Sequence, residues 1–330
     1  MRRARSSARK AQSTFVPPPI LGINAQDNVA DMDVRFALRM NNMFPEKSYV
    51  RGRRGKSEHG TVASGNIKTL HEYRYGSTTE LVAFTDTGKW YDASSTGAAT
   101  EIGTGHNGGL WDCVTHNDIL VAASKNTSDA PQQWNGTSQT AITLSGTGLT
   151  TTDLKKVAVH QSRLYWVEDG TLSFWYGATN SIGGMLTEFP LKHIAKSGGE
   201  ILDIASWTVD GGDGLNDYLV IVTTGGDVIV YQGSDPGDAT NFSIVGIWRI
   251  PEPIYDDGWG FMMEYGSDVL ILTSEGVCSL HGLMQEGRFQ GAADFTRNIR
   301  RYWIEDVRAY GRQSPWVMKV WPGRNMLFVH

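Results

Sequence analysis

The feature that most constrains the fold of this chain is a strand–turn–strand unit that recurs along it. In the clearest copy, Tyr218 to Gly233, a β-branched run turns at Thr223-Thr-Gly-Gly226 and returns through Asp227 to Tyr231. A Gly-Gly turn between two such runs is typical of a β-hairpin. Further copies have the same form, the last with a longer loop: Leu81 to Tyr91, Arg163 to Trp175, Asp268 to Leu280 and Asp118 to Trp134.

The spacing of these hairpins indicates how they are assembled. Four returning strands end at a glycine, namely Gly136, Gly177, Gly233 and Gly282, at separations of 41, 56 and 49 residues. Four-stranded units of roughly 40–50 residues are the blades of β-propellers. A β-sandwich with similar hairpins is the alternative, but repetition at blade spacing favours an all-β propeller of about six blades.

The sequence divides into five complete units and a partial sixth. The sixth is expected to contain strands at Val307–Tyr310 and Trp316–Val320, and its shortness leaves the blade count and the closure of the ring open. The expected units are Leu70 to Gly103, Leu110 to Thr147, Val157 to Pro190, Ile201 to Glu252, Trp259 to Asp294 and Tyr302 to His330.

The composition agrees with an all-β fold. The 330 residues include 38 Gly, 11 Trp and 12 Tyr, which supply turns and strand-forming aromatic residues. Long amphipathic helical patterns are nearly absent, and the only candidate is a short helix around Val29 to Asn41. No apolar run approaches the ~18 residues of a membrane span, so we expect no membrane insertion.

Charge is distributed unevenly along the chain. Residues 1–55 hold eleven Lys and Arg against four Asp and Glu, a net charge of +7, and the remainder carries −12. A basic leader on an acidic body is expected to dock on an acidic partner or on nucleic acid. We divide the chain into a basic arm over residues 1–14, an extended docking segment over 15–62 and a propeller body over 63–330.

Residue patterns for catalysis, cofactors or metals are weak. Cys113 and Cys278 have no metal-ligand spacing, and we expect them to be reduced and buried. The His residues form neither a metal pair nor a triad, so we expect no enzyme activity, no cofactor and no metal. Whether the acidic loop from Asp210 to Asp217 binds a cation is left open.

Three short motifs in the lead-in resemble a known family. They are Gly22-Ile23-Asn24, the stretch Asn42-Met43-Phe44-Pro45, and a cluster after Tyr49 that contains Arg51, Arg53 and Arg54. Together they resemble the start of the tail nozzle proteins of short-tailed bacteriophages, also called tail tubular protein B, and of packaged-DNA stabilisation proteins. Val228 to Pro236 and Val245 to Ile250 are also similar to this family.

The resemblance implies a structural virion protein made in the host cytoplasm and located in the phage tail. It implies a homo-oligomeric ring, expected to be six-fold, that attaches to the tail adaptor, retains packaged double-stranded DNA and forms the conduit for its ejection. The assembly and docking residues would be those of the three motifs, and tail fibres are a further implied partner. A glycan-binding or glycan-cleaving tail propeller and a generic propeller scaffold remain alternatives.

One dense basic cluster lies outside the lead-in. It consists of Arg297, Arg300 and Arg301, followed by Trp303. Such a cluster is expected either to contact DNA phosphates or to pair with an acidic neighbouring subunit. The net acidic balance of the body favours the contact between subunits.

Overall fold

A computed structural model describes residues 16–210, 215–254, 260–311, 313, 316–324 and 326–330. The chain forms two compact units, which are described separately. The lead-in unit comprises Met1–Lys56 and Asn298–Tyr302, and the propeller unit comprises Ser57–Arg297 and Trp303–His330. The division falls after Lys56, a few residues before the expected boundary at 62. Gly60 and Thr61 already pair in parallel with Gly97 and Ala98 of the first blade.

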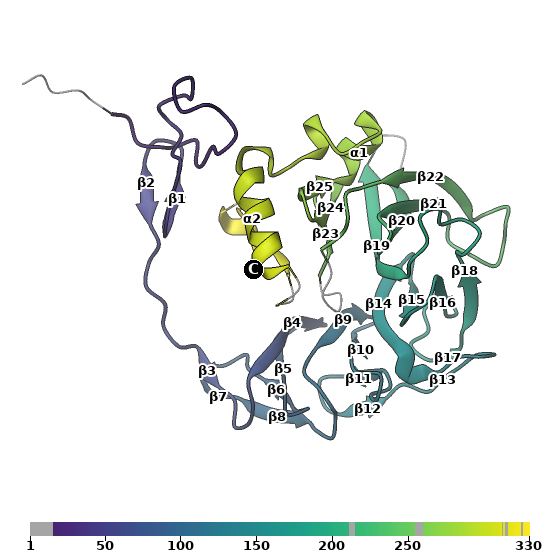
Figure 1. Cartoon of the computed structure of the whole chain (residues 1–330). Helices are drawn as coiled ribbons and strands as arrows, with labels where there is room; N and C mark the ends of the chain where they lie inside the picture. The colour runs from purple at the N-terminus through teal and green to yellow at the C-terminus, as the bar shows by residue number, and fades with distance from the viewer. Residues whose placement is uncertain (1–15, 211–214, 255–259, 312, 314–315, 325) are drawn as a thin grey trace, which may run out of the picture. The chain divides into compact units, whose positions relative to one another are not determined.

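The propeller unit is a β-propeller, with successive antiparallel sheets arranged around a common axis (Figure 1). Four sheets have four strands, the fifth has three and the sixth has two. The first two sheets are β4 (Ile67–Tyr75), β5 (Thr78–Thr85), β6 (Trp90–Asp92) and β8 (Thr100–Gly103), then β9 (Trp111–His116), β10 (Ile119–Ser124), β11 (Gln132–Trp134) and β12 (Gln139–Ala141). The next two are β14 (Leu154–His160), β15 (Arg163–Glu168), β16 (Ser173–Tyr176) and β18 (Thr187–Pro190), then β19 (Ile201–Asp210), β20 (Leu215–Thr223), β21 (Asp227–Gln232) and β22 (Ser243–Arg249). The last two are β23 (Met262–Tyr265), β24 (Asp268–Thr273) and β25 (Gly276–Ser279), then β26 (Met318–Trp321) and β27 (Met326–Val329).

The remaining elements are short. Two short pairs of parallel strands involve segments next to the first and third sheets, and 3₁₀ turns lie in the connections between strands. These elements are β3 (Gly60–Thr61) with β7 (Gly97–Ala98), β13 (Leu144–Ser145) with β17 (Gly184–Met185), and the turns η1 (Thr151–Asp153), η2 (Gly291–Ala293), η3 (Arg297–Ile299) and η4 (Pro322–Arg324).

All five expected hairpins are present as the second and third strands of sheets one to five. A buried Thr at the end of the second strand holds the turn in sheets one, four and five. Thr223 Oγ1 accepts a hydrogen bond from Asp227 N at 3.2 Å, and Thr85 Oγ1 likewise accepts one from Lys89 N at 3.3 Å. In the fifth sheet the Thr273 hydroxyl donates to Gly276 O at 2.7 Å across the turn. Gly226 has φ +85°, and a Cβ there would lie 2.8 Å from Ile250 O, so only glycine fits this turn.

Buried apolar clusters fill the spaces between successive sheets. Sheets one and two enclose Phe84, Trp90 and Trp111. The rings of Trp90 and Trp111 pack edge to face, with their centroids 5.0 Å apart. Separate clusters lie between sheets two and three, between three and four, and between four and five. The β-branched and aromatic residues that predicted strands therefore also form the core.

Two helices occur where the sequence predicted strands. Val307–Tyr310 belongs to α2 (Arg300–Tyr310), because Trp303 and Val307 lie one turn apart and face the core. The charged residues of the same helix, Glu305, Asp306 and Arg308, are exposed. Leu280–Gly282 begins α1 (Leu280–Glu286) rather than ending a strand. Ser279 caps this helix by accepting a hydrogen bond from Gly282 N.

The helix expected at Val29–Asn41 is not formed. Asn28 and Asp33 accept hydrogen bonds from backbone N–H groups two residues further on, which competes with helical bonding. Ala37 N instead donates to Gly22 O at 2.8 Å. The lead-in unit also contains a small hairpin of β1 (Met43–Pro45) and β2 (Val50–Gly52). Among the described residues, no helix has the length and apolar character needed to span a membrane.

Candidate functional site

The three lead-in motifs are brought together in one small unit. Pro45 Cγ lies 3.8 Å from the position of a Cβ on Gly22, which has φ +83°. Phe44 and Arg51 pair across the β1–β2 hairpin. The segment is therefore a compact element of irregular chain with one hairpin, and its motifs lie close together rather than being spread along an extended strand.

Asn24 is the buried polar residue of this unit, with 2% of its surface exposed. Its side-chain Oδ1 accepts hydrogen bonds from Gln26 N and Asp27 N, and its Nδ2 donates to Asp27 at 2.8 Å. Ile23 forms a parallel bridge with Ala37. Gly22, Ile23 and Asn24 thus build the internal scaffold of the lead-in.

The arginines of the third motif differ in their surroundings. Arg51 is half-buried, lies over the Phe44 ring at 5.4 Å and pairs with Glu46 at 3.2 Å. Arg53 and Arg54 have exposed side chains, and Arg53 N donates to Asn42 O at 2.6 Å. Asn42 has φ +55°, which suits Asn better than most residues. Arg51 is therefore structural, and Arg53 and Arg54 are available to a partner.

The second basic cluster is divided between the two units. Arg300 and Arg301 lie in the first turn of α2 and belong to the lead-in unit, whereas Arg297 lies in η3 of the propeller unit. Ala25 N donates to Asn298 O at 2.8 Å, and the Tyr302 hydroxyl donates to Leu38 O at 2.9 Å. Sequence reasoning did not foresee that part of this cluster joins the lead-in.

This grouping sharpens the charge asymmetry. The sequence of the lead-in unit holds fourteen Lys and Arg against four Asp and Glu, a net +10, whereas the propeller unit holds sixteen against thirty-one, a net −15. The lead-in also exposes apolar side chains. Seven large ones are exposed by at least two fifths: Val16, Leu21, Val29, Val34, Leu38, Met43 and Tyr49.

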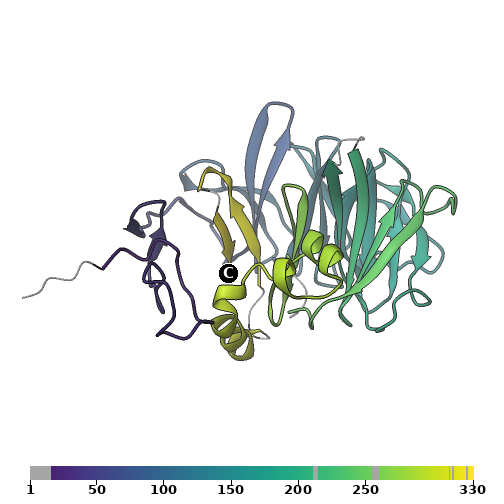
Figure 2. The ribbon, with the colours of Figure 1, turned by 90° about the horizontal axis from the view of Figure 1, so that it is seen from above.

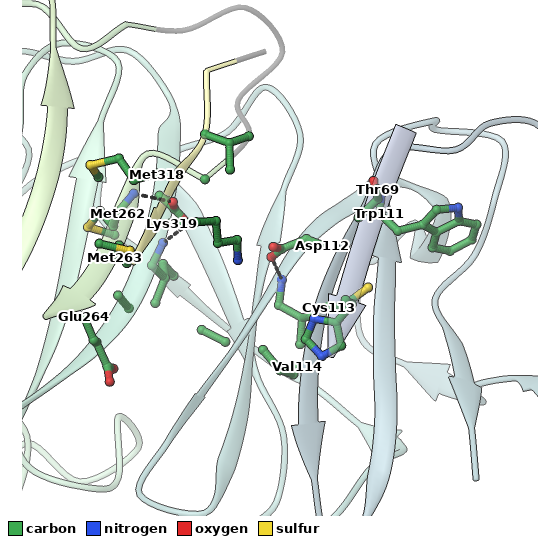
Figure 3. A pocket seen from close by; sticks show the side chains of 18 of the residues that line it. Thr69, Trp111, Asp112, Cys113, Val114, Met262, Met263, Glu264, Met318 and Lys319 are labelled. Atoms are coloured by element: carbon green, nitrogen blue, oxygen red, sulfur yellow. Dashed lines mark hydrogen bonds between the residues drawn. The ribbon is translucent and has the colours of Figure 1, made fainter. Parts of the chain in front are cut away.

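The propeller unit has a cavity along its axis, which we call the central channel (Figure 3). Its volume is about 850 Å³, and residues of the innermost strands β4, β9, β14, β19, β23 and β26 line it. Asp112, Cys113, Met262, Glu264 and Lys319 are among the lining side chains.

Polar groups connect the innermost strands in sequence. Thr69 of β4 accepts from Trp111 N, and Asp112 of β9 accepts from Val157 N at 2.9 Å. Lys156 of β14, only 3% exposed, pairs with Asp203 of β19 at 3.1 Å. Asp203 also accepts from Met262 N of β23. We call this series the inter-blade ladder. It satisfies the backbone N–H groups of Trp111, Val157 and Met262, and it pairs the two buried charges of Lys156 and Asp203, so these charged residues have a structural role.

Burial shifts the titration of several channel groups. Burial, and then the charge of Lys319, lowers the pKa of His71 to about 4, and His71 Nε2 has no hydrogen-bond partner among the described residues. Burial raises the pKa of Asp112, although Lys156 opposes this. Cys113 and Cys278 are both free, and burial raises the pKa of each thiol, which disfavours the reactive thiolate.

Two segments weighed from the sequence fall at least partly outside the described residues. Asp213, in the loop from Asp210 to Asp217, is not described, and neither is the basic arm over residues 1–14. Within the described part of the chain, no group of three or more His, Cys, Asp or Glu is placed to hold a metal ion.

Comparisons with known proteins were made by sequence and by structure. No family model and no curated protein matches the chain. Among solved structures, BBS1N in complex with ARL6DN has a TM-score of 0.42 at 14% identity, covering 64% of this chain and 64% of that one. The Polycomb Repressive Complex 2 of Chaetomium thermophilum bound to GSK126 has a TM-score of 0.42 at 15% identity, covering 76% and 63%. YCF48 bound to D1 peptide has a TM-score of 0.35 at 10% identity, covering 72% and 67%.

The chain spans less than two thirds of the first two of these structures. At TM-scores below 0.5 these likenesses carry no argument about partners or activity. The propeller assignment rests on the sheet order and on the channel described above.

Proposed function

We propose that the chain is a structural subunit of a phage tail nozzle, in which the lead-in unit docks on a neighbouring subunit or on the tail adaptor. The observation that carries the proposal is the convergence of all three resembling motifs in one compact, strongly basic unit. Its scaffold residues Asn24 and Arg51 are held internally, while Arg53 and Arg54 remain exposed.

The charges of the two units support docking between copies. A lead-in of +10 and a propeller of −15 attract each other when they belong to different subunits. A contact between unlike surfaces of identical chains is heterologous, and it generates a ring when the rotation closes. The exposed apolar side chains of the lead-in would add buried area to this contact.

The net acidity of the propeller unit suits a conduit for DNA. Acidic surfaces repel phosphates, so double-stranded DNA would pass through the ring without strong contacts. The channel inside each propeller is not this conduit, because a cavity of about 850 Å³ is too small to hold a DNA duplex.

The test is the oligomeric state of the purified full chain, measured by native mass spectrometry and electron microscopy. We expect a symmetric ring that Arg53→Glu with Arg54→Glu disperses, since the double change reverses two exposed lead-in charges. The matched control is Lys192→Glu with Lys196→Glu, which makes the same charge change at exposed positions of the propeller unit. A monomer under all conditions, or equal dispersal by the control, would refute the proposal.

A further inference from the structure

One ion pair of the propeller unit is enclosed between two neighbouring sheets. Lys156 of β14 and Asp203 of β19 belong to the third and fourth sheets, which lie side by side (Figure 1 and Figure 2). Lys156 Nζ lies 3.1 Å from Asp203 Oδ1, and the two side chains are 3% and 12% exposed. The centroid of the buried Phe261 ring lies 5.5 Å from the same Nζ. The two charged groups are therefore held in contact in an apolar part of the molecule.

A third carboxyl group adjoins this pair. Asp112 of β9 accepts a hydrogen bond at 2.9 Å from the backbone N–H of Val157, the residue after Lys156. Burial raises the pKa of Asp112, the charge of Lys156 opposes this rise, and the charge of Asp203 adds to it. The Asp112 carboxyl therefore keeps its proton to a higher pH than an exposed carboxyl does, and it lies within electrostatic reach of both partners.

The carboxyl groups of Asp112 and Asp203 also border the central channel. Both residues line it, and Figure 3 shows Asp112 on its wall. Asp203 is held by backbone donors, since Oδ1 accepts from Ile204 N at 3.0 Å and Oδ2 accepts from Met262 N at 3.3 Å. The acyl carbon of Asp203 is thus fixed beside the Lys156 amine, and a small molecule released from it has a route into the channel.

The neighbouring Lys155 shows what burial changes. Lys155 Nζ contacts Asp169 Oδ1 at 2.6 Å and Glu200 Oε2 at 3.3 Å, so this lysine also has two carboxylates beside it. Those carboxylates are 46% and 31% exposed, and water stabilises their charges. Lys156 and its partner are out of water, so moving the proton from the ammonium to the carboxylate costs less free energy there than at a surface. The neutral amine and neutral carboxyl that result are the forms that react with each other.

We propose that Lys156 and Asp203 condense to form an amide bond that joins β14 to β19. The amine lone pair of Lys156 attacks Cγ of Asp203 and forms the C–N bond. Asp112 gives its proton to the departing hydroxyl and receives one from the nitrogen, so the C–O bond breaks and one water molecule leaves. An ammonium and a carboxylate thus become an amide and water, with no change of oxidation state. Reactants held in a reactive orientation reach effective concentrations of about 10⁵–10⁸ M, which offsets the unfavourable condensation of the two ions.

The test is the mass of the denatured full chain, measured by electrospray mass spectrometry. We expect a mass that is smaller than that of the sequence by one water molecule. Tandem mass spectrometry of a protease digest should then find one pair of peptides joined through Lys156 and Asp203. Lys155 is the internal control, and its side chain should be unlinked. A chain of full mass, or a link at Lys155 instead, would overturn the proposal.

A first variant locates the source of the lost water. Lys156→Arg keeps the positive charge but removes the attacking amine, so the full mass of the variant sequence should return. A shortfall that persists in this variant would come from dehydration elsewhere in the chain and would refute the bond. The digest of the unaltered chain needs no variant, so the proposal stays open to refutation if Lys156→Arg does not fold.

A second variant tests the part given to Asp112. Asp112→Asn keeps an oxygen that can accept from Val157 N but has no carboxyl proton to give. In a time course of cell-free synthesis, the linked form should accumulate at least tenfold more slowly, although the circular dichroism of the folded variant is unchanged. Accumulation at the original rate would show that Asp112 takes no part in the reaction. The bond lies within one propeller unit and does not depend on ring assembly, so it can fail while the nozzle proposal stands.

Discussion

Sheets one to four and sheets five and six of this propeller are connected in different ways. Each of the first four sheets has four strands, and buried apolar clusters join each one to the next. The sixth sheet adds Met318, Leu327 and Val329 to the cluster of the fifth sheet. No buried apolar cluster of the described residues joins the sixth sheet to the first sheet, where Leu70 of β4 is 52% exposed.

The inter-blade ladder follows the same division. It runs from Thr69 through Asp112, Lys156 and Asp203 to Met262 N. Among the described residues it does not continue from β23 to β26. The ring is therefore held by successive contacts between sheets one to five, and we expect its last sheet to open at a lower free energy than the rest.

The largest effect is expected when the inter-blade ladder is cut. Asp203→Ala leaves the Lys156 ammonium buried without its carboxylate and removes the acceptor of Met262 N. Loss of one partner of a buried ion pair costs about 3–5 kcal/mol of unfolding free energy. Urea denaturation followed by tryptophan fluorescence measures this loss.

The matched control is Asp169→Ala. Asp169 pairs with Lys155 at 2.6 Å, but its side chain is 46% exposed. Exposed pairs contribute about 0–1 kcal/mol, so this change should be nearly silent. If both variants lose the same stability, the ladder is not what holds the middle of the ring.

A second prediction compares the same substitution in the two regions. Leu120→Ala empties a fully buried site between sheets one and two and should cost about 2–5 kcal/mol. Leu327→Ala removes a half-buried side chain from the sixth sheet and should cost about 1 kcal/mol, because less apolar area is lost. Equal losses in urea denaturation would show that the sixth sheet is as firmly held as the others.

The sequence predicted the regular part of this molecule well. The hairpins could be recognised because both strands and the turn lie within about fifteen residues, as in Tyr218 to Gly233. Glycine repetition was a weaker guide. Gly233 has φ +113° at a strand end, whereas Gly282 lies inside α1.

The irregular part depended on contacts that local patterns do not contain. The strand expected at Val307–Tyr310 is helical because Trp303 and Val307 pack together against the fifth sheet. The pairing of Lys156 with Asp203 joins two separate sheets, and neither residue stands out in its own strand. The signal that could have indicated a buried pair is that Lys156 and Asp203, which have opposite charges, each occupy a strand position that faces inward.

The smallest expected effect concerns His71, which lies on β4 in the channel region also lined by Lys319. Its pKa falls from 6.5 to about 4 in the folded chain, mainly through burial and then through the charge of Lys319. The unfolded state therefore takes up the proton first, and stability is lost as the pH falls from about 6.5 to about 4. His71→Gln should remove this loss of stability from the pH profile of unfolding.

Lys319→Met tests the closing junction directly. Without this ammonium, the pKa of His71 measured by NMR titration should rise toward its ordinary value, but burial should keep it below 6.5. His160 is the internal control, since burial lowers its pKa and no contribution from Lys319 is present. An unchanged His71 titration would mean that the sixth sheet does not approach β4 closely enough to influence it electrostatically.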